Sequence, residues 1–275
     1  EISACLVGSE MCIRDSYISG TTVGGLFGRL VVSAITDFVS WRMGLIAIGI
    51  LYLAVGIAFF MLLPKPKYQR QRQSGGLQLI KTFHTALANK KLLWIYLVAF
   101  LIMGSFVAVF NFISYVLLAP PYSLSQTVVG LLFVVYLFGT FSSTYMGRLS
   151  DQQGNGRVLI LGLLIMLTGG LLTLLQPLVF KFIGLAIFTF GMLGSHSVAC
   201  GWVGKLNRGD KAQSSSMYMF FYYAGASSLG TLGGVFLESC GWSGVIGMVA
   251  AAVIICLLVV VRLELAVSQH LLWHQ

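Results

Sequence analysis

The sequence predicts an all-α fold, a polytopic membrane bundle in which eight helices cross the bilayer. Hydrophobic residues make up 57% of the 275 residues, charged residues only 9%, and the mean hydropathy is +0.90. A soluble domain needs more charge to solvate its surface, so this composition is typical of an integral membrane protein. The apolar residues also lie in runs of roughly 20, the length of a helix that crosses a hydrocarbon core of about 30 Å.

The net charge of +9 comes from basic residues that lie mainly between the apolar runs. In a soluble chain this excess would suggest a nucleic-acid partner. Here the cations are placed at the membrane surface, where anionic lipid headgroups are the simpler partner. We therefore expect contact with the lipid bilayer and none with nucleic acid.

Residues 1–16 (EISACLVGSEMCIRDS) do not fit the pattern that follows them. They lack the order of a signal peptide, and no periodicity continues from them into the next run. The string resembles a translation of sequencing-adapter DNA, so we expect an artefactual segment. Cys5 and Cys12 then carry no meaning.

Two apolar runs come next, Tyr17–Ile35 and Met43–Leu63. Pro64 and Pro66 end the second run, because proline cannot continue a helix. Arg29 interrupts the first run. Small residues spaced along a span let a neighbouring helix approach closely. The first run carries four of them, Gly20, Gly24, Gly25 and Gly28.

Residues 65–91 form the one long polar segment, with seven Lys or Arg residues and no acid. An excess of basic residues marks a cytoplasmic loop. Leu77, Ile80 and Leu87 recur at helical spacing, which predicts an amphipathic helix on the inner leaflet. We expect this segment to be the linker between two membrane regions, residues 17–64 and 92–265.

Six apolar runs follow the linker. Basic residues in the loops divide thirteen on the linker side against two on the other, Arg42 and Lys181. This bias places the linker and a tail at residues 266–275 in the cytoplasm. The six predicted spans are Leu92–Leu118, Val128–Met146, Val158–Leu175, Leu178–Val203, Ser215–Leu237 and Gly244–Arg262.

The stretch Gly147–Arg157 (GRLSDQQGNGR) is a charged loop between two of these runs. It resembles the cytoplasmic loop signature of the major facilitator superfamily, G-x-x-x-D-R-x-G-R-R-x. The matching residues are Gly147, Asp151, Gly154 and Arg157, with Arg148 as a further cation. Gln152 and Asn155 stand where that signature usually has Arg. The alternative interpretation is an ordinary tight turn with a helix cap.

An internal repeat agrees with this resemblance. Gly24–Gly28 followed by Trp41 is similar to Gly230–Gly234 followed by Trp242, and Gly230 and Gly234 are again small packing residues. The superfamily has two six-helix halves. The resemblance therefore implies that residues 17–64 hold the fifth and sixth helices, that residues 92–265 hold the seventh to twelfth, and that helices one to four are absent from an incomplete fold.

Arg29 is the first candidate for the substrate cavity, because a guanidinium inside a span costs about 2.5–3.5 kcal/mol unless it meets a partner. It could instead reach an interface. Further candidates are Asn111 and Tyr115, which share a helix face, His196, and Tyr218 with Tyr222. His196 could carry a coupling proton or only pack.

Asp151 is a candidate for the cytoplasmic gate. The resemblance places the acid of this loop near the start of the fifth helix, here around Tyr17–Ser19, where the helix dipole favours a carboxylate. A purely local helix cap is the alternative.

The resemblance implies secondary active transport of small organic solutes by alternating access, in the form of proton-coupled efflux by a monomer in a bacterial inner membrane. We expect that the protein is not an enzyme and that it holds neither a cofactor nor a metal ion. The sequence has no phosphate-binding loop and no Cys or His at metal-ligand spacing. A membrane-embedded enzyme, a non-transporting receptor or assembly protein, and an inactive fragment are the alternatives.

Overall fold

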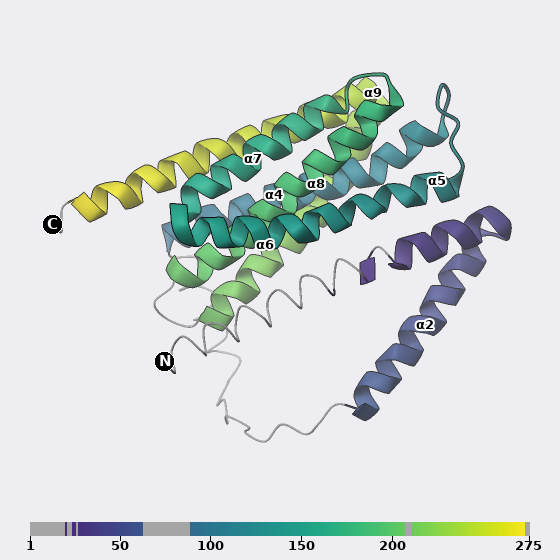
Figure 1. The fold of residues 1–275 in the computed structure, drawn as a ribbon, viewed down its shortest axis with the longest axis horizontal. Coiled ribbons are helices and arrows are strands. Elements are labelled where there is room, and N and C mark those ends of the chain that lie inside the picture. The colour runs from purple at the N-terminus through teal and green to yellow at the C-terminus, as the bar shows by residue number, and fades with distance from the viewer. Residues whose placement is uncertain (1–19, 21–23, 26, 63–88, 207–210, 273–275) are drawn as a thin grey trace.

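The computed structural model describes residues 20, 24–25, 27–62, 89–206 and 211–272. Within these ranges the chain is helical and has no strand, so the predicted all-α class is confirmed. Figure 1 shows the arrangement. The helices are α2 (Trp41–Leu62), α4 (Lys90–Leu118), α5 (Gln126–Leu131), the short 3₁₀ helix η1 (Leu132–Val135), α6 (Tyr136–Gln153), α7 (Asn155–Leu172), α8 (Leu178–Leu206) and α9 (Lys211–Leu272).

Six helical segments of the described chain are long and apolar enough to cross a membrane. One of them joins α5, η1 and α6 into a single stretch, Gln126–Gln153. Another, α9, contains two of the predicted spans, because it reverses direction at Gly241, where φ is 64° and ψ is −157°. Of the first predicted span, Tyr17–Ile35, only part is described, and residues 27–38 are helical.

The loop predicted at Gly147–Arg157 is wrong in extent. Helix α6 continues to Gln153 and α7 begins at Asn155, so only Gly154 leaves the helical conformation. The apolar run ends near Met146, but a helix that continues beyond a hydrocarbon layer tolerates polar side chains. Hydropathy therefore predicts where the apolar residues end and does not predict where the helix ends.

Two further boundaries differ from the prediction. Helix α4 begins at Lys90, inside the predicted linker, where the Asn89 side chain accepts a hydrogen bond from the Lys91 backbone N–H. Lys181, predicted in a loop, lies in the first turn of α8 and is only 4% exposed. The rest of the linker, residues 65–88, lies outside the described residues.

The core is built from α4 packed against α9, with α7 and α6 packed against α8. Glycine permits the closest of these contacts. A Cβ atom added to Gly225 of α9 would overlap the Phe100 carbonyl oxygen of α4, and one added to Gly104 would lie 2.6 Å from the Gly225 oxygen. The two backbones therefore touch at this crossing, as expected for spans whose packing depends on van der Waals contact.

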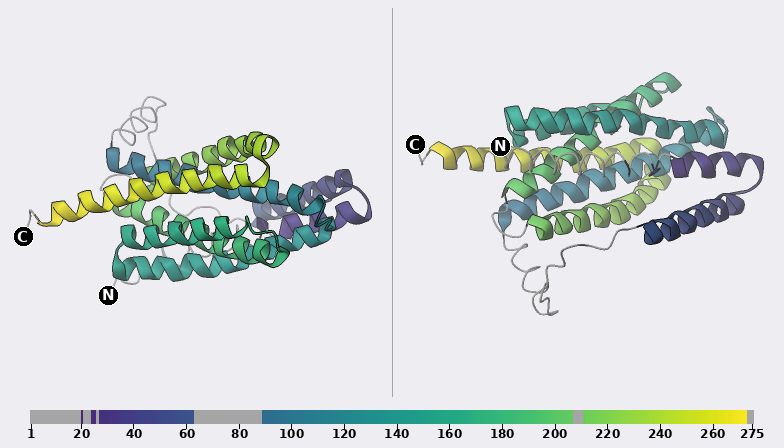
Figure 2. Two further views of the ribbon diagram at one scale, coloured as in Figure 1. Left: turned by 90° about the horizontal axis from the view of Figure 1, so that it is seen from above. Right: turned by 60° about the horizontal axis from the view of Figure 1, so that its bottom comes forward.

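Helix α2 lies apart from this core, beside residues 27–38 (Figure 2). Gly44 is its only buried residue, and a Cβ there would lie 3.3 Å from Val32. The remaining side chains of α2, apart from Arg42, are largely apolar and exposed, as on a helix that faces lipid or further helices.

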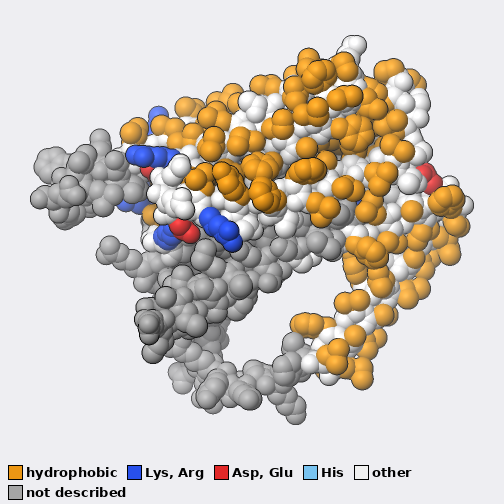
Figure 3. Space-filling model, viewed as in Figure 1, with side chains coloured by type: hydrophobic (Ala, Val, Ile, Leu, Met, Phe, Trp, Pro, Cys, Tyr) orange, Lys and Arg blue, Asp and Glu red, His pale blue; other side chains and the backbone are white. Residues whose placement is uncertain are grey.

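Charged side chains gather at one end of the bundle, and apolar side chains cover most of the visible face (Figure 3). We call the charged end the basic end and the opposite one the far end. Residues of the basic end include Lys90, Arg148, Arg157, Lys205 and Arg262. Residues of the far end include Asp37, Tyr122, Thr173 and Trp242.

Candidate functional site

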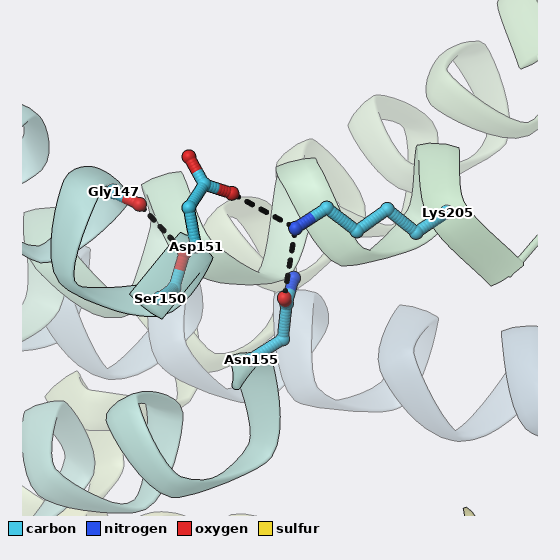
Figure 4. Close-up of polar contacts among 5 residues, drawn as sticks. All are labelled: Gly147, Ser150, Asp151, Asn155 and Lys205. Atoms are coloured by element: carbon cyan, nitrogen blue, oxygen red, sulfur yellow. Dashed lines mark hydrogen bonds and ion pairs between the residues drawn. The ribbon is translucent and has the colours of Figure 1, made fainter. Parts of the chain in front are cut away.

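At the basic end, Asp151 forms an ion pair with Lys205 across the turn between α6 and α7 (Figure 4). The Lys205 Nζ lies 2.9 Å from Asp151 Oδ1 and 3.1 Å from Asn155 Oδ1, so it donates to both. Ser150 is buried, and its hydroxyl donates to the Gly147 carbonyl oxygen at 2.7 Å. The end of α8 is thus tied to the α6–α7 turn by one cation with two acceptors.

The family resemblance predicted that Asp151 lies near residues 17–19, which lie outside the described residues. It did not predict Lys205 as the partner, although Lys205 closely follows the predicted span Leu178–Val203. Asn155, a departure from the superfamily signature, accepts a hydrogen bond here, where an Arg could only donate.

The other residues of the stretch Gly147–Arg157 have separate surroundings. Gly154 has φ 94° and ψ 144°, a conformation open essentially to glycine alone. Gly156 is buried beneath the Glu264 carboxylate of α9. Arg148 and Arg157 are exposed. The stretch Gly147–Arg157 therefore contains one glycine required by its conformation, one glycine required by packing, and an acid that pairs with Lys205 of α8.

Arg29 lies against aromatic rings. Its guanidinium carbon is 4.3 Å from the centroid of the Phe133 ring in η1. Phe133 packs on Phe110 and Tyr136, with ring centroids 5.5 and 5.6 Å apart. A cation over an aromatic face is stabilised by the ring quadrupole. This contact also links the region before residue 65 to the region after residue 89.

Three predicted cavity residues meet between α8 and α9. The His196 Nδ1 lies 3.0 Å from the Tyr218 hydroxyl oxygen, and the His196 and Tyr222 ring centroids are 4.4 Å apart. All three side chains are buried. The cluster pairs a titratable ring with a hydroxyl that can donate or accept, a combination able to hold or pass a proton.

Asn111 and Tyr115 lie elsewhere, on an exposed face of α4. Tyr115 is 65% exposed and stacks on Phe112 with ring centroids 6.2 Å apart. A Cβ at Gly230 would lie 4.0 Å from the Asn111 amide nitrogen. The structure therefore separates this pair from the His196 cluster.

The predicted packing glycines also fall into different groups. A Cβ at Gly230 would lie 2.7 Å from Val107, and one at Gly234 would lie 3.3 Å from the Phe112 ring, so both face α4. A Cβ at Gly28 would lie 2.8 Å from the Tyr52 hydroxyl oxygen. A Cβ at the remaining three would meet none of the described atoms within 4 Å; these are Gly20, Gly24 and Gly25.

Asp37 makes a contact at the far end that sequence analysis missed. Its Oδ1 accepts from the Gln126 backbone N–H at 3.1 Å, and its Oδ2 accepts from the Thr127 backbone N–H at 2.6 Å and from the Thr127 hydroxyl. Ser33, one turn earlier, donates its hydroxyl to the Gln126 carbonyl oxygen at 2.5 Å. Asp37 therefore caps a helix 89 residues further along the chain.

These hydrogen bonds lower the pKa of the Asp37 carboxyl below its ordinary value. The Thr127 hydroxyl makes the largest contribution, and the Thr127 and Gln126 backbone N–H groups add to it. The positive end of the α5 dipole acts in the same direction. An acid just after an apolar run is a weak signal for such a cap, because it does not identify the partner helix.

Lys181 anchors a second cluster at the far end. Its Nζ donates to the Thr173 carbonyl oxygen at 2.6 Å and lies 5.9 Å from the ring centroids of Tyr122 and Trp242. The Trp242 indole N–H donates to the Thr173 carbonyl oxygen at 3.1 Å. The turns α4–α5, α7–α8 and the reversal in α9 are thereby held together.

Among the described residues, no three His, Cys, Asp or Glu side chains lie close enough to hold a metal ion.

A family model of the Major Facilitator Superfamily matches residues 16–125 and 104–271. An uncharacterised MFS-type transporter of Bacillus subtilis, YybF, is 40% identical over 259 residues, which cover 94% of this chain and 63% of that protein. The inner membrane transport protein YnfM of Escherichia coli is 41% identical over 248 residues, covering 90% and 60%. An uncharacterised transporter of Buchnera aphidicola is 36% identical over 248 residues, covering 90% and 60%. The chain thus spans about 60% of the length of these relatives.

Proposed function

The chain belongs to the major facilitator superfamily, and from this premise we propose that it serves secondary active transport of small organic solutes by alternating access. The names of its relatives in Bacillus subtilis and Escherichia coli, both transporters, support the general activity. The proposed orientation has the basic end in the cytoplasm of a bacterial cell with an inner membrane, because the sequence pattern predicts thirteen basic residues on that side against two on the other.

The observation that carries the proposal is the Asp37 cap. Alternating access requires contacts between two helical regions that form at one end of the bundle and break in each cycle. Asp37 belongs to the region before residue 65, and its partners Gln126 and Thr127 belong to the region after residue 89. The contact is exposed to solvent, so water can replace each hydrogen bond when the regions separate.

In this proposal the structure represents a state with the far end closed. The Asp151–Lys205 pair lies within the second region, where it fixes the α6–α7 turn against α8. It serves as a rigid part of the cytoplasmic gate, and any contact with residues 17–19 would add to it.

We further propose that protons couple transport and that the direction is efflux by a monomer. The His196–Tyr218 pair supports the coupling, since both side chains are buried and the His196 Nδ1 lies 3.0 Å from the Tyr218 hydroxyl oxygen. The adjacent Tyr222 ring suits solutes with aromatic groups.

The test uses the full 275-residue chain in proteoliposomes that enclose a pH-sensitive dye. An imposed pH gradient should collapse faster when an aromatic amphiphile from a fixed panel is added. The Asp37→Asn variant should slow this collapse, whereas the neighbouring, exposed Phe38→Ala control should not. The proposal fails if no compound changes the internal pH beyond the rate in protein-free liposomes, which would favour a receptor or an inactive chain.

A further inference from the structure

A groove opens at the basic end between the first turns of α4 and the last turns of α9. Its volume is about 470 Å³. Lys90, Lys91 and Trp94 line it from α4, and Ile255, Leu258 and Arg262 line it from α9. The second arm of α9 lies beside the start of α4, as the left view of Figure 2 shows.

The charge of this groove is of one sign. Three cations reach it from two helices, and its lining contains no acidic residue. The nearest acid in sequence, Glu264, is not among the lining residues, and its carboxylate lies against Gly156 of α7. None of the three cations has an acidic partner in the lining, so the groove favours a ligand that brings negative charge.

The apolar part of the groove extends from this charged rim toward the middle of the membrane. Ile255 lies seven residues before Arg262 on one helix, a rise of about 10 Å at 1.5 Å per residue. Ile255 and Leu258 are 46% and 62% exposed, so they face the hydrocarbon directly. Trp94 is 44% exposed one turn above Lys91, the depth that indole rings favour at a membrane interface.

We propose that this groove binds an anionic diacyl phospholipid, such as phosphatidylglycerol, from the leaflet at the basic end. The lipid phosphate lies among Lys90, Lys91 and Arg262, and one acyl chain runs along Ile255 and Leu258. Basic pockets between membrane helices are suited to such headgroups. A free phosphate ion would use the charged rim and leave the apolar wall without a role, so the wall selects the lipid.

The consequence is a lipid-dependent tie between α4 and the end of α9. These helices form the most extensive contact of the described chain and meet backbone to backbone at Gly104 and Gly225. A bound phosphate bridging Lys90 and Arg262 adds a connection at their ends. This role concerns the bilayer alone and holds whichever solute the protein moves.

The experiment is lipid binding to the purified full chain in detergent, measured by native mass spectrometry. Phosphatidylglycerol is compared with phosphatidylcholine carrying the same acyl chains. The Lys90→Gln/Arg262→Gln variant should bind phosphatidylglycerol roughly 25-fold more weakly, about fivefold for each charge removed. The matched control, Arg148→Gln/Arg157→Gln, removes two cations from the same end and should retain the preference. Lys90→Arg/Lys91→Arg should retain it as well.

A second measurement locates the lipid without a charge change. Phosphatidylglycerol with brominated acyl chains should quench the tryptophan fluorescence of the chain, and the Trp94→Phe variant should lose that quenching. The proposal is overturned if both charge-removal variants lose the same affinity, if phosphatidylcholine binds as tightly, or if inorganic phosphate displaces the lipid at equal concentration. Circular dichroism confirms that each variant keeps its helices.

Discussion

Replacing Gly225 by alanine should separate α4 from α9, and the structure allows the cost to be worked out. The new methyl group would overlap the Phe100 carbonyl oxygen, which belongs to a helix backbone and cannot rotate away. Forcing extra volume into a packed contact costs about 1–3 kcal/mol. Alanine in place of glycine in a helix returns up to about 1 kcal/mol of backbone free energy, so the net loss is smaller than the steric cost.

The matched control is Gly247→Ala in the second arm of α9, because a Cβ there meets no described atom within 4 Å. It carries the same gain in helix propensity without the overlap. The difference in unfolding free energy between the two variants therefore isolates the steric cost, and we expect Gly225→Ala to be lower by about 1–3 kcal/mol. Titration with SDS, followed by circular dichroism, measures both variants.

The two variants would unfold at the same SDS fraction if α4 and α9 did not meet at this crossing. Equal midpoints would therefore refute the packing described here. A further check is Gly104→Ala, whose Cβ would lie 2.7 Å from Leu229 Cδ1. In a double-mutant cycle, Leu229→Ala should cost less in the Gly104→Ala background than alone, because it removes that Cδ1 atom.

Three other predictions follow from the polar contacts. Because its folded pKa is lowered, the Asp37 contact should be intact at pH values above the ordinary 3.8 and lost only as pH falls through the lowered value. Spin labels at Phe38 and Val128 should move apart at that lower pH, and they should move apart at pH 7 in Asp37→Asn. Lys205→Ala should destabilise the chain by only about 0.2–1 kcal/mol in SDS titration, since the pair is exposed. Tyr218→Phe should cost about 1 kcal/mol in the same assay, because it removes the hydroxyl bonded to the buried His196.

Each of these has an outcome that contradicts it. An unchanged label distance in Asp37→Asn at pH 7 would show that Asp37 does not hold the far end. If Lys205→Ala lowers the unfolding free energy by more than about 2 kcal/mol, the loss exceeds what exposed ion pairs contribute. That result would show that the pair is desolvated in the folded protein. If Tyr218→Phe has the same unfolding free energy as the wild type, the His196 ring has another hydrogen-bond partner that replaces the Tyr218 hydroxyl.

The apolar runs predicted the fold class and most of the spans, because burial in hydrocarbon demands long apolar helices. Leu92–Leu118 and Leu178–Val203 correspond to α4 and α8 with shifts of three residues or fewer. The same signal could not find helix ends, since backbone hydrogen bonding continues outside the bilayer. The polar residues Ser150 and Asp151 therefore lie in α6, although the pattern suggested a loop.

The site was predicted less completely, because its contacts join residues far apart in the chain. The pattern identified Asp151 and His196 by residue type, but Lys205 became a partner only once α8 lay beside the α6–α7 turn. Asp37 has its partners 89 and 90 residues away. Lys181 was predicted in a loop because charge counting assumes that a lysine lies in solvent. The Thr173 carbonyl oxygen accepts a hydrogen bond from its ammonium group, and this contact allows the side chain to be buried.

The single residue between α6 and α7 has a mechanical consequence. Only Gly154 lies between the two helices, so the connection is too short for them to move independently. We therefore expect a tilt of α6 to be accompanied by a tilt of α7. Lengthening this joint by a few flexible residues would let each helix move alone. Lys205 of α8 bonds one residue of each helix, Asp151 of α6 and Asn155 of α7. After such an insertion, a movement of α8 would no longer move α6 and α7 together.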